Sequence, residues 1–339
     1  MECGLVSGDG RRLRRYHLKL SLLILIMRII FCGTPQFAVP TLEQLIEEKF
    51  EIGLVVTNPD EPQGRGYQMK ASPVKEAAAR AGLKVFQPAK LKDPSVQEVI
   101  TSVHPEAIIV VAYGHIIPGW MIDLPPFGAI NLHASLLPKY RGAAPIPWSI
   151  VRGESVTGVT TMKIGRGLDT GPILLQEEIA IGPGDTSETL VEQLSVIGAS
   201  LMMKTLRRIE SANIEPRPQD ESVATYAPIL RKEDGRIEWK KSADEIWKLV
   251  RGMRPWPTAF TTFRGRGLQI WAVAPAAEVV DSSVPSGTLR TEPKRLLVAC
   301  GDSSWLEIQE LQLEGRRRMG ATEFLNGVRL RPDDKLGGP

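Results

Sequence analysis

The stretch RIIFCGTPQFAVPTLEQLIEE, residues 28–48, contains one complete strand, turn and helix pattern. Its first part, residues 29–32, is continuously apolar, which is typical of a strand buried on both faces of a sheet. Gly33, Thr34 and Pro35 then predict a turn. Apolar residues recur at helical spacing over residues 39–48, and Pro40 is tolerated in the first turn of a helix. The stretch therefore predicts the first unit of an α/β fold.

The same alternation continues along the chain. Short apolar runs predict strands, and amphipathic runs between them predict helices. This order favours an α/β fold with a doubly wound parallel sheet, whose ligands bind beyond the carboxyl ends of the strands. The expected elements are strands at 52–57, 84–86, 107–111 and 129–132, helices at 74–81 and 94–103, and a Pro- and Gly-rich loop at 58–73.

The composition and the hydrophobic pattern of the sequence change after residue 210. A long helix is expected over residues 187–209, and residues 211–226 are rich in Pro, Asp, Glu and Ser, which predicts a linker. Short alternating runs separated by Gly, Pro and Ser then predict a small all-β barrel or sandwich. These strands are expected at 236–239, 259–263, 268–273, 295–299 and 306–313. We therefore expect one domain over residues 27–210, a linker over 211–226 and a second domain over 227–339.

Composition limits the classes of protein that fit. The chain has 339 residues, of which 42% are hydrophobic, at a net charge of +3, and this combination excludes a disordered protein. The three cysteines, Cys3, Cys32 and Cys300, lie too far apart in sequence to predict a disulfide framework, so we expect a cytoplasmic protein. The net charge is −4 over residues 27–226 and +4 over residues 227–339. A basic C-terminal part is a reason to look for a polyanionic partner.

The first 26 residues have part of the pattern of a secretory signal peptide. Four arginines at positions 11–15 precede an apolar run over residues 20–26, but this run is too short to span a bilayer, and no small-residue cleavage site follows it. We expect residues 1–26 to be a non-native or disordered extension, with Met27 as the start of the functional chain. We expect no membrane partner and a monomer.

Two of the four histidines follow predicted buried strands. Of these, His133 is the more informative, because Asn131 lies two residues earlier and shares its face in an extended strand. An amide donor and an imidazole on one face could stabilise an oxyanion and transfer a proton. A turn-forming asparagine and a structural histidine remain an alternative interpretation. Asp169, held between glycines in Gly167-Leu168-Asp169-Thr170-Gly171, is the best candidate for a carboxylate partner, although an ordinary turn aspartate fits the spacing too.

Several other kinds of site are not indicated. Pro35 occupies the position of the second glycine in a dinucleotide-binding G-x-G-x-x-G motif, and Gly64-Arg65-Gly66 lacks the Gly-Lys-Ser/Thr ending of a phosphate loop. No cluster of His, Cys and carboxylates has ligand spacing, so no metal is expected. No serine or cysteine has the setting of an activated nucleophile, which disfavours covalent catalysis.

Several motifs carry a resemblance to a known family. The segment Asn131-x-His133-x-Ser135-Leu136-Leu137-Pro138 resembles that of the formyltransferases that use 10-formyltetrahydrofolate. So does the segment Gly158-Val159-Thr160-Thr161, which runs into Leu168-Asp169-Thr170-Gly171. The order of motifs from residue 27 onward is most similar to the members that act on methionyl-tRNA. Further motifs that carry this resemblance are residues 28–35, 59–66, 135–145 and 226–230. The resemblance covers about nine-tenths of the chain.

The resemblance implies a fold, a reaction and a set of residues. It implies a Rossmann-like formyltransferase domain followed by an OB-like β-barrel that binds tRNA. It implies direct transfer of the formyl group to the α-amino group of initiator methionyl-tRNA through a tetrahedral intermediate, with 10-formyltetrahydrofolate as co-substrate and no permanently bound cofactor. The implied catalytic residues are Asn131, His133 and Asp169. The implied folate-binding residues are Tyr113, Gly114, Ser135, Leu136, Leu137 and Pro138.

The loop around Arg65 and the C-terminal domain are the candidate tRNA contacts. Arg65 and Lys70 fit a solvated surface loop, and the resemblance favours a finger whose basic side chains meet tRNA phosphates. Arginines at 264, 266 and 316–318 add positive charge to the second domain. The tryptophans at 239, 247, 256 and 271 are expected to be core residues and not platforms for base stacking.

Three other functions fit part of the sequence. A formyltransferase acting on a small amine, such as glycinamide ribonucleotide or an amino sugar, would share the catalytic residues but leave the basic second domain unexplained. A non-catalytic tRNA-binding protein would not need the three candidate catalytic residues. A nicotinamide dehydrogenase would need the missing glycine motif.

Overall fold

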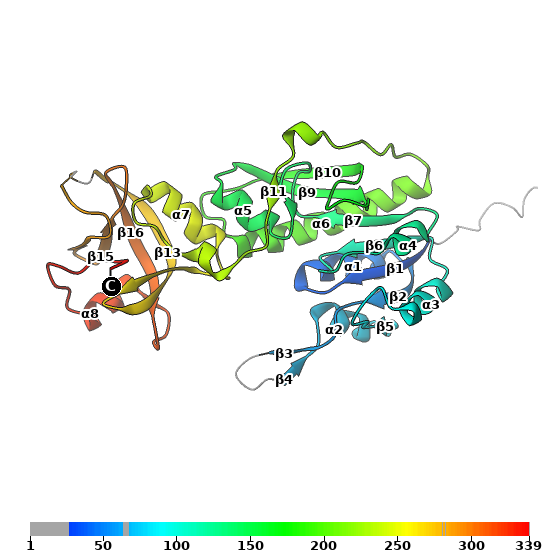
Figure 1. Cartoon of the computed structure of the whole chain (residues 1–339), viewed down its shortest axis with the longest axis horizontal. Helices are drawn as coiled ribbons and strands as arrows, with labels where there is room; N and C mark the ends of the chain where they lie inside the picture. The colour runs from blue at the N-terminus through cyan, green and yellow to red at the C-terminus, as the bar shows by residue number, and fades with distance from the viewer. Residues whose placement is uncertain (1–26, 64–67, 280, 282, 339) are drawn as a thin grey trace, which may run out of the picture.

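The computed structural model describes residues 27–63, 68–279, 281 and 283–338. The predicted N-terminal extension at residues 1–26 lies outside the described residues. Figure 1 shows an elongated molecule in which a sheet flanked by helices forms one lobe and a second sheet forms the other. Helix α7 (Ala243–Gly252) lies where the two lobes meet, beside α5 (Pro145–Val151).

The first lobe has a seven-stranded mixed sheet. Its five central and outer strands run parallel, whereas β9 is antiparallel to β7, and β10 is antiparallel to β9. The expected doubly wound parallel sheet is therefore extended at one edge by two antiparallel strands. Exposed residues alternate with partly buried ones over residues 177–180 of β10, the pattern of an antiparallel strand with one solvated face. In sheet order the strands are β10 (Ile173–Ala180), β9 (Val156–Lys163), β7 (Ala129–His133), β6 (Ala107–Val111), β1 (Arg28–Gly33), β2 (Glu51–Val56) and β5 (Val85–Phe86).

Helices cover both faces of this sheet. Along β1, Ile29 and Phe31 enter the core under one set of helices, and Ile30 and Cys32 enter the core under the other. Both sets of side chains are fully buried, which explains the continuous apolar run. Burial also raises the pKa of the Cys32 thiol. The first set is α1 (Val39–Glu47), α2 (Pro73–Arg80), α5 and α6 (Ser187–Glu210), and the second is α3 (Pro94–Ser102) and α4 (Gly119–Asp123).

The segment expected to be a loop at 58–73 contains a β-hairpin. Strands β3 (Glu61–Gln63) and β4 (Gln68–Lys70) pair antiparallel, and Figure 1 shows the hairpin projecting from the body of the first lobe. Lys70 is exposed on it, and Arg65 lies outside the described residues. The hairpin was not predicted because each of its strands is only three residues long, too short for a periodic pattern.

The second lobe is built on an antiparallel sheet. Lys335 and Leu336 form bridges to Thr288 and Phe263, so the C-terminal segment connects the two edges of the sheet. The expected strand at 236–239 is only a bridge between Arg236 and Phe260, and the amphipathic helix α7 was not predicted. The sheet order is β12 (Ala259–Phe263), β13 (Arg266–Val279), β16 (Ser304–Leu313), β15 (Arg295–Ala299) and β14 (Leu289–Glu292), with β17 (Met319–Gly320) paired to β16 and α8 (Ala321–Gly327) after it.

The tryptophans of this lobe do not all lie in its core. Trp239 is buried, and Trp247 packs against the core from its edge. Trp256 is 56% exposed, which contradicts the expectation of a core residue. The neighbouring prolines at 255 and 257 explain its exposure, because they keep this short segment out of a helix or strand that would turn the ring inward.

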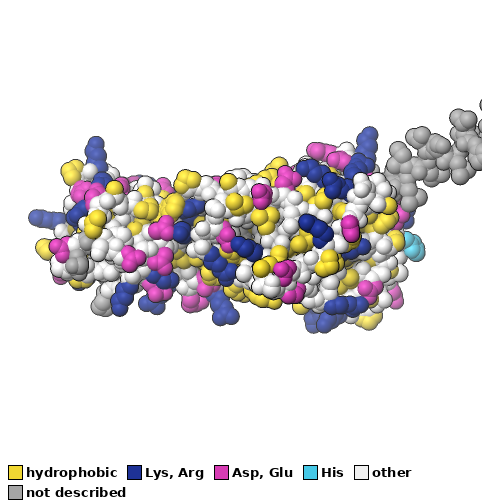
Figure 2. All heavy atoms as spheres, turned by 90° about the horizontal axis from the view of Figure 1, so that it is seen from above, with side chains coloured by type: hydrophobic (Ala, Val, Ile, Leu, Met, Phe, Trp, Pro, Cys, Tyr) yellow, Lys and Arg dark blue, Asp and Glu magenta, His cyan; other side chains and the backbone are white. Residues whose placement is uncertain are grey.

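The surface and the helices add two observations. On the face drawn in Figure 2, basic and acidic side chains are interspersed over both lobes and do not gather in a single patch. Among the described residues, no helix has both the length and the apolar character needed to cross a membrane.

Candidate active site

Strand β7 carries two of the predicted catalytic residues at its carboxyl end. Leu132, between them, is buried in the core on the opposite face, which turns Asn131 and His133 to the same side of the sheet. His133 is the last residue of the strand and pairs with Thr160 of the antiparallel neighbour β9. No other described side chain forms a hydrogen bond with the Asn131 amide, so that amide is available to a ligand.

The imidazole of His133 has a defined orientation. Its Nε2 lies 2.9 Å from the backbone oxygen of Tyr140, and its Nδ1 lies 3.7 Å from Oδ2 of Asp169. A carbonyl oxygen only accepts hydrogen bonds, so Nε2 donates to it and carries a proton. Nδ1 is therefore the nitrogen that faces the carboxylate. The side chain of His133 is 7% exposed and that of Asp169 is 14% exposed, so little water screens this pair.

Asp169 lies on a tight turn between β9 and β10. Its backbone has φ of +51°, and its Oδ2 accepts a hydrogen bond from the Gly142 amide at 2.8 Å. The turn passes so close to β9 that a Cβ at Gly171 would lie 1.7 Å from the Lys163 carbonyl oxygen, so only glycine fits there. The hydrogen bond from Gly142 and the close approach at Gly171 hold the Asp169 carboxylate in the direction of β7.

The predicted folate-binding segment, residues 135–138, is held by one threonine. Oγ1 of Thr160 donates to the Ser135 carbonyl at 2.6 Å and accepts from the Leu137 amide at 3.2 Å. Gln176 donates to the same hydroxyl and to the Leu137 carbonyl. The segment therefore forms a rigid shelf beside β7, which we call the 135–138 shelf.

The other predicted folate-binding residues follow β6. Tyr113 is 2% exposed and lies in the core, so only its backbone can reach a ligand; its carbonyl accepts a hydrogen bond from Thr34. Burial raises the pKa of the Tyr113 hydroxyl. Gly114 follows with φ of +85° and is exposed. His115, which follows the end of β6, is exposed, and its ring lies tilted by 52° to that of Tyr113, with the ring centroids 5.3 Å apart.

Sequence reasoning missed three groups of this site. The carbonyl of Tyr140 and the amide of Gly142 act through the backbone, and no side-chain pattern announces them. Thr160 lies in the segment Gly158-Val159-Thr160-Thr161, which carries the family resemblance but does not state the role of its hydroxyl. Tyr140 and Gly142 lie within the motif at residues 135–145, which carries the resemblance too.

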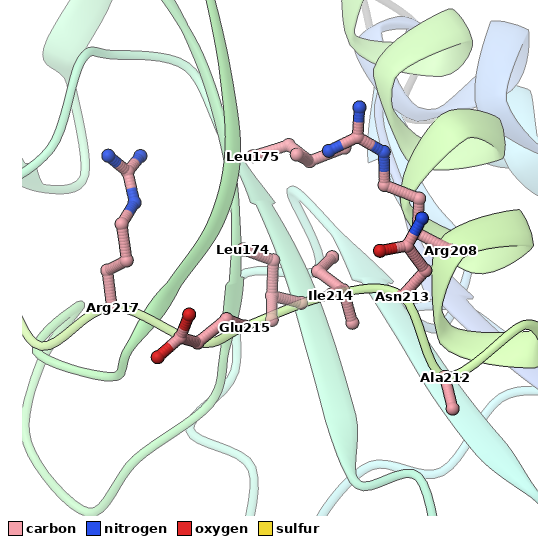
Figure 3. A pocket seen from close by; sticks show the side chains of 8 residues that line it. All are labelled: Leu174, Leu175, Arg208, Ala212, Asn213, Ile214, Glu215 and Arg217. Carbon is pink, nitrogen blue, oxygen red and sulfur yellow. The ribbon is translucent and has the colours of Figure 1, made fainter.

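A pocket of about 480 Å³ lies away from these residues, between β10 and the segment after α6. In Figure 3, Arg208 and Arg217 lie on opposite sides of the strand that carries Leu174 and Leu175. None of the predicted site residues lines this pocket. Among the described residues, no group of three or more His, Cys, Asp and Glu side chains could hold a metal ion.

Comparisons with known proteins identify relatives over most of the chain. A family model described as "Formyl transferase" matches residues 27–206, and one described as "Formyl transferase, C-terminal domain" matches residues 229–329. A methionyl-tRNA formyltransferase from Acidobacterium capsulatum is 52% identical over 92% of this chain and 100% of its own length. The methionyl-tRNA formyltransferase of Koribacter versatilis is 53% identical over 92% of this chain and 99% of its own length.

Solved structures show a related fold at low identity. The N-formyltransferase from Helicobacter canadensis, determined in complex with folinic acid and dTDP-3-aminofucose, matches with a TM-score of 0.64 and 19% identity. The match covers 83% of this chain and 98% of that one. At this identity the likeness concerns the fold alone.

Proposed function

The chain belongs to the formyl transferase family, and we propose that it transfers the formyl group of 10-formyltetrahydrofolate to the α-amino group of methionyl-initiator tRNA. The observation that carries the proposal is the His133–Asp169 pair at the end of β7, in a chain that matches methionyl-tRNA formyltransferases across both of its domains. The product is formylmethionyl-tRNA, the species that initiates translation.

The reaction proceeds by direct attack. The amine nitrogen forms a bond to the formyl carbon, and negative charge develops on the formyl oxygen. Asn131 and His133 hold that oxyanion, because their side chains share one face of β7 at its carboxyl end. The intermediate collapses when the bond between the formyl carbon and N10 of the folate breaks.

The carboxylate of Asp169 accepts the proton that the reaction releases. The attacking nitrogen loses one proton and N10 gains one, so the reaction needs no oxidant and consumes no net proton. Asp169 takes the proton from the amine, through a water molecule. Its oxygen lies 3.7 Å from Nδ1 of His133, so the carboxylate that takes the proton lies directly beside the imidazole that holds the oxyanion.

The two substrates occupy different parts of the molecule. The 135–138 shelf and the backbone at Tyr113 and Gly114 hold the folate, at the carboxyl ends of β7 and β6. Basic side chains meet the tRNA phosphates: Lys70 on the β3–β4 hairpin, Arg65 in the sequence between the two strands, and those of the C-terminal domain. The projection of the hairpin in Figure 1 suits contact with a large substrate.

Single-turnover formyl transfer from labelled 10-formyltetrahydrofolate tests the proposal. Charged initiator tRNA, charged elongator methionyl-tRNA and glycinamide ribonucleotide are offered side by side. We expect label on initiator methionyl-tRNA alone. Label on the small amine would replace the proposal with a small-molecule formyltransferase, and no transfer to any acceptor would overturn the assignment of this reaction.

A further inference from the structure

The tripeptide Tyr140–Gly142 contacts both residues of the catalytic pair. The Tyr140 carbonyl accepts from Nε2 of His133, and the Gly142 amide donates to Oδ2 of Asp169. Two adjacent peptide units therefore fix the direction of the imidazole and of the carboxylate. Any displacement of this tripeptide changes the distance between the two groups.

The same tripeptide is held by the segment between the domains. Arg141 and Gly142 form the short strand β8 (Arg141–Gly142), which pairs in parallel with β11 (Tyr226–Ala227). The Arg141 amide donates to the Thr225 carbonyl at 2.8 Å, and the Tyr140 amide donates to the Thr225 hydroxyl at 2.9 Å. The segment 211–226, which was expected to be a linker, is thus hydrogen-bonded to the first domain.

The guanidinium of Arg141 is the centre of this attachment. Its side chain is fully buried, and a buried charge is tolerated only when it is paired. It donates two hydrogen bonds to Glu221, at 2.8 Å each, and two to Oε1 of Gln219, at 3.0 and 2.8 Å. The bonds to Arg141 hold the pKa of the Glu221 carboxyl below its usual value, so Glu221 is ionised at neutral pH.

Gln219 connects Arg141 to the turn that carries Asp169. While its Oε1 accepts from Arg141, its Nε2 donates to the backbone oxygens of Asp169, at 2.7 Å, and of Gly171, at 2.8 Å. The turn holds Asp169 at a positive φ, which costs free energy for a residue other than glycine. The amide of Gln219 satisfies two carbonyls of that strained turn and so stabilises it.

We infer that Gln219 is a positioning residue of the reaction, which acts through Arg141 and the Asp169 turn to hold the carboxylate of Asp169 against Nδ1 of His133. This inference rests on the proposed function for its kinetic consequence. Gln219 does not touch the reacting atoms. Its role is to hold the backbone of the turn that carries Asp169 in a fixed position relative to Arg141.

Two substitutions of Gln219 remove different sets of its hydrogen bonds to Arg141 and to the turn that carries Asp169. Gln219→Glu keeps an acceptor for Arg141 but loses both N–H donors to the turn, and Gln219→Met has a similar length without either bond. We expect both to lower kcat about ten- to a hundred-fold, with the KM for folate and tRNA nearly unchanged, because a small misplacement of a catalytic group affects the transition state more than binding. Gln193→Glu is the matched control. Gln193 is exposed on α6 and donates a hydrogen bond to Asp185, just before that helix, so its substitution should leave kcat unaltered.

A second measurement does not depend on activity. With glycine labelled by ¹⁵N, the Gly142 amide proton reports its hydrogen bond to Asp169 by its chemical shift. We expect this proton to move upfield in both Gln219 variants and to stay in place in the control. Glu221→Gln, on an exposed side chain, provides a milder variant that loosens Arg141 and should move the same resonance less.

The outcomes separate the two proposals. Wild-type kcat in both variants, an increase of KM alone, or an unmoved Gly142 resonance would overturn the positioning role. If the wild-type chain formylates no acceptor but the Gly142 resonance moves as expected, the proposed function fails and the structural link from Gln219 to Asp169 stands.

Discussion

Oδ2 of Asp169 lies 3.7 Å from Nδ1 of His133. The two residues are 36 positions apart in sequence and belong to different elements, a turn and a strand end. Their proximity depends on backbone groups of Tyr140 and Gly142 that hold one residue each. Under the proposed function, this pair is the first target for substitution.

Asp169→Asn is expected to lower kcat about a hundred- to ten-thousand-fold, because the amide cannot accept the proton of the amine. The amide is close in shape to the carboxylate, so the KM for either substrate should change little. Single-turnover transfer to initiator methionyl-tRNA measures the loss. Asp123→Asn, at an exposed ion pair with Arg166, is the control, and equal losses in the two variants would contradict the role of Asp169.

Thr160→Val is expected to raise the KM for the formyl donor about ten-fold. The substitution keeps the shape of the side chain but leaves the Ser135 carbonyl and the Leu137 amide without their partner, so the 135–138 shelf loosens. Thr161→Val is the matched control, because Thr161 is equally buried and its hydroxyl bonds Thr205. Both variants should unfold at lower temperature, and a similar KM in both would argue against a folate-binding shelf.

Lys70→Ala is expected to weaken tRNA binding and to reduce the salt dependence of that binding. A lysine that neutralises one phosphate adds about one unit to the slope of log K against log salt concentration. The measurement is tRNA affinity at several salt concentrations. Lys92→Ala, at an exposed lysine outside the β3–β4 hairpin, should leave the slope unchanged. An unchanged slope in Lys70→Ala would exclude a phosphate contact at this position.

Asp334→Asn is expected to lower the melting temperature at pH 7 by about 3 °C. The hydrogen bonds from the Arg264 guanidinium, and one from the Arg331 amide, hold the pKa of the Asp334 carboxyl below its usual value. A carboxyl with a lowered folded-state pKa stabilises the protein above its unfolded pKa, and this stability is lost as the pH falls through the folded pKa.

The difference between wild type and Asp334→Asn should therefore shrink below about pH 4. Thermal unfolding followed at pH 7, 5 and 3 checks this. Asp333→Asn, at the exposed neighbouring residue, is the control and should change the melting temperature little at any of these pH values. A difference that grew on acidification would contradict the assignment.

Residues 28–48 and the runs at 107–111 and 129–132 were sufficient to predict the α/β class of the first lobe. Their apolar runs and helical spacing are local properties that tertiary contacts did not override, and β6 has the predicted bounds. The direction of β9 and β10 was not predictable in the same way, because a strand pattern does not state which neighbour it pairs with. The hairpin β3–β4 was too short to give a periodic signal.

The sequence by itself determined the α/β class of the first lobe, the resemblance to the formyltransferases and the candidate residues Asn131, His133 and Asp169. Asn131 and His133 follow from residue types two positions apart, and Asp169 follows from its place between glycines and from the resemblance. The tertiary structure alone decided that segment 211–226 is part of the site's support, because Gln219 meets Arg141 and Asp169 across 78 and 50 positions of sequence. Hydrogen bonds between such distant positions form only when the chain is folded, and composition had suggested nothing more than a linker.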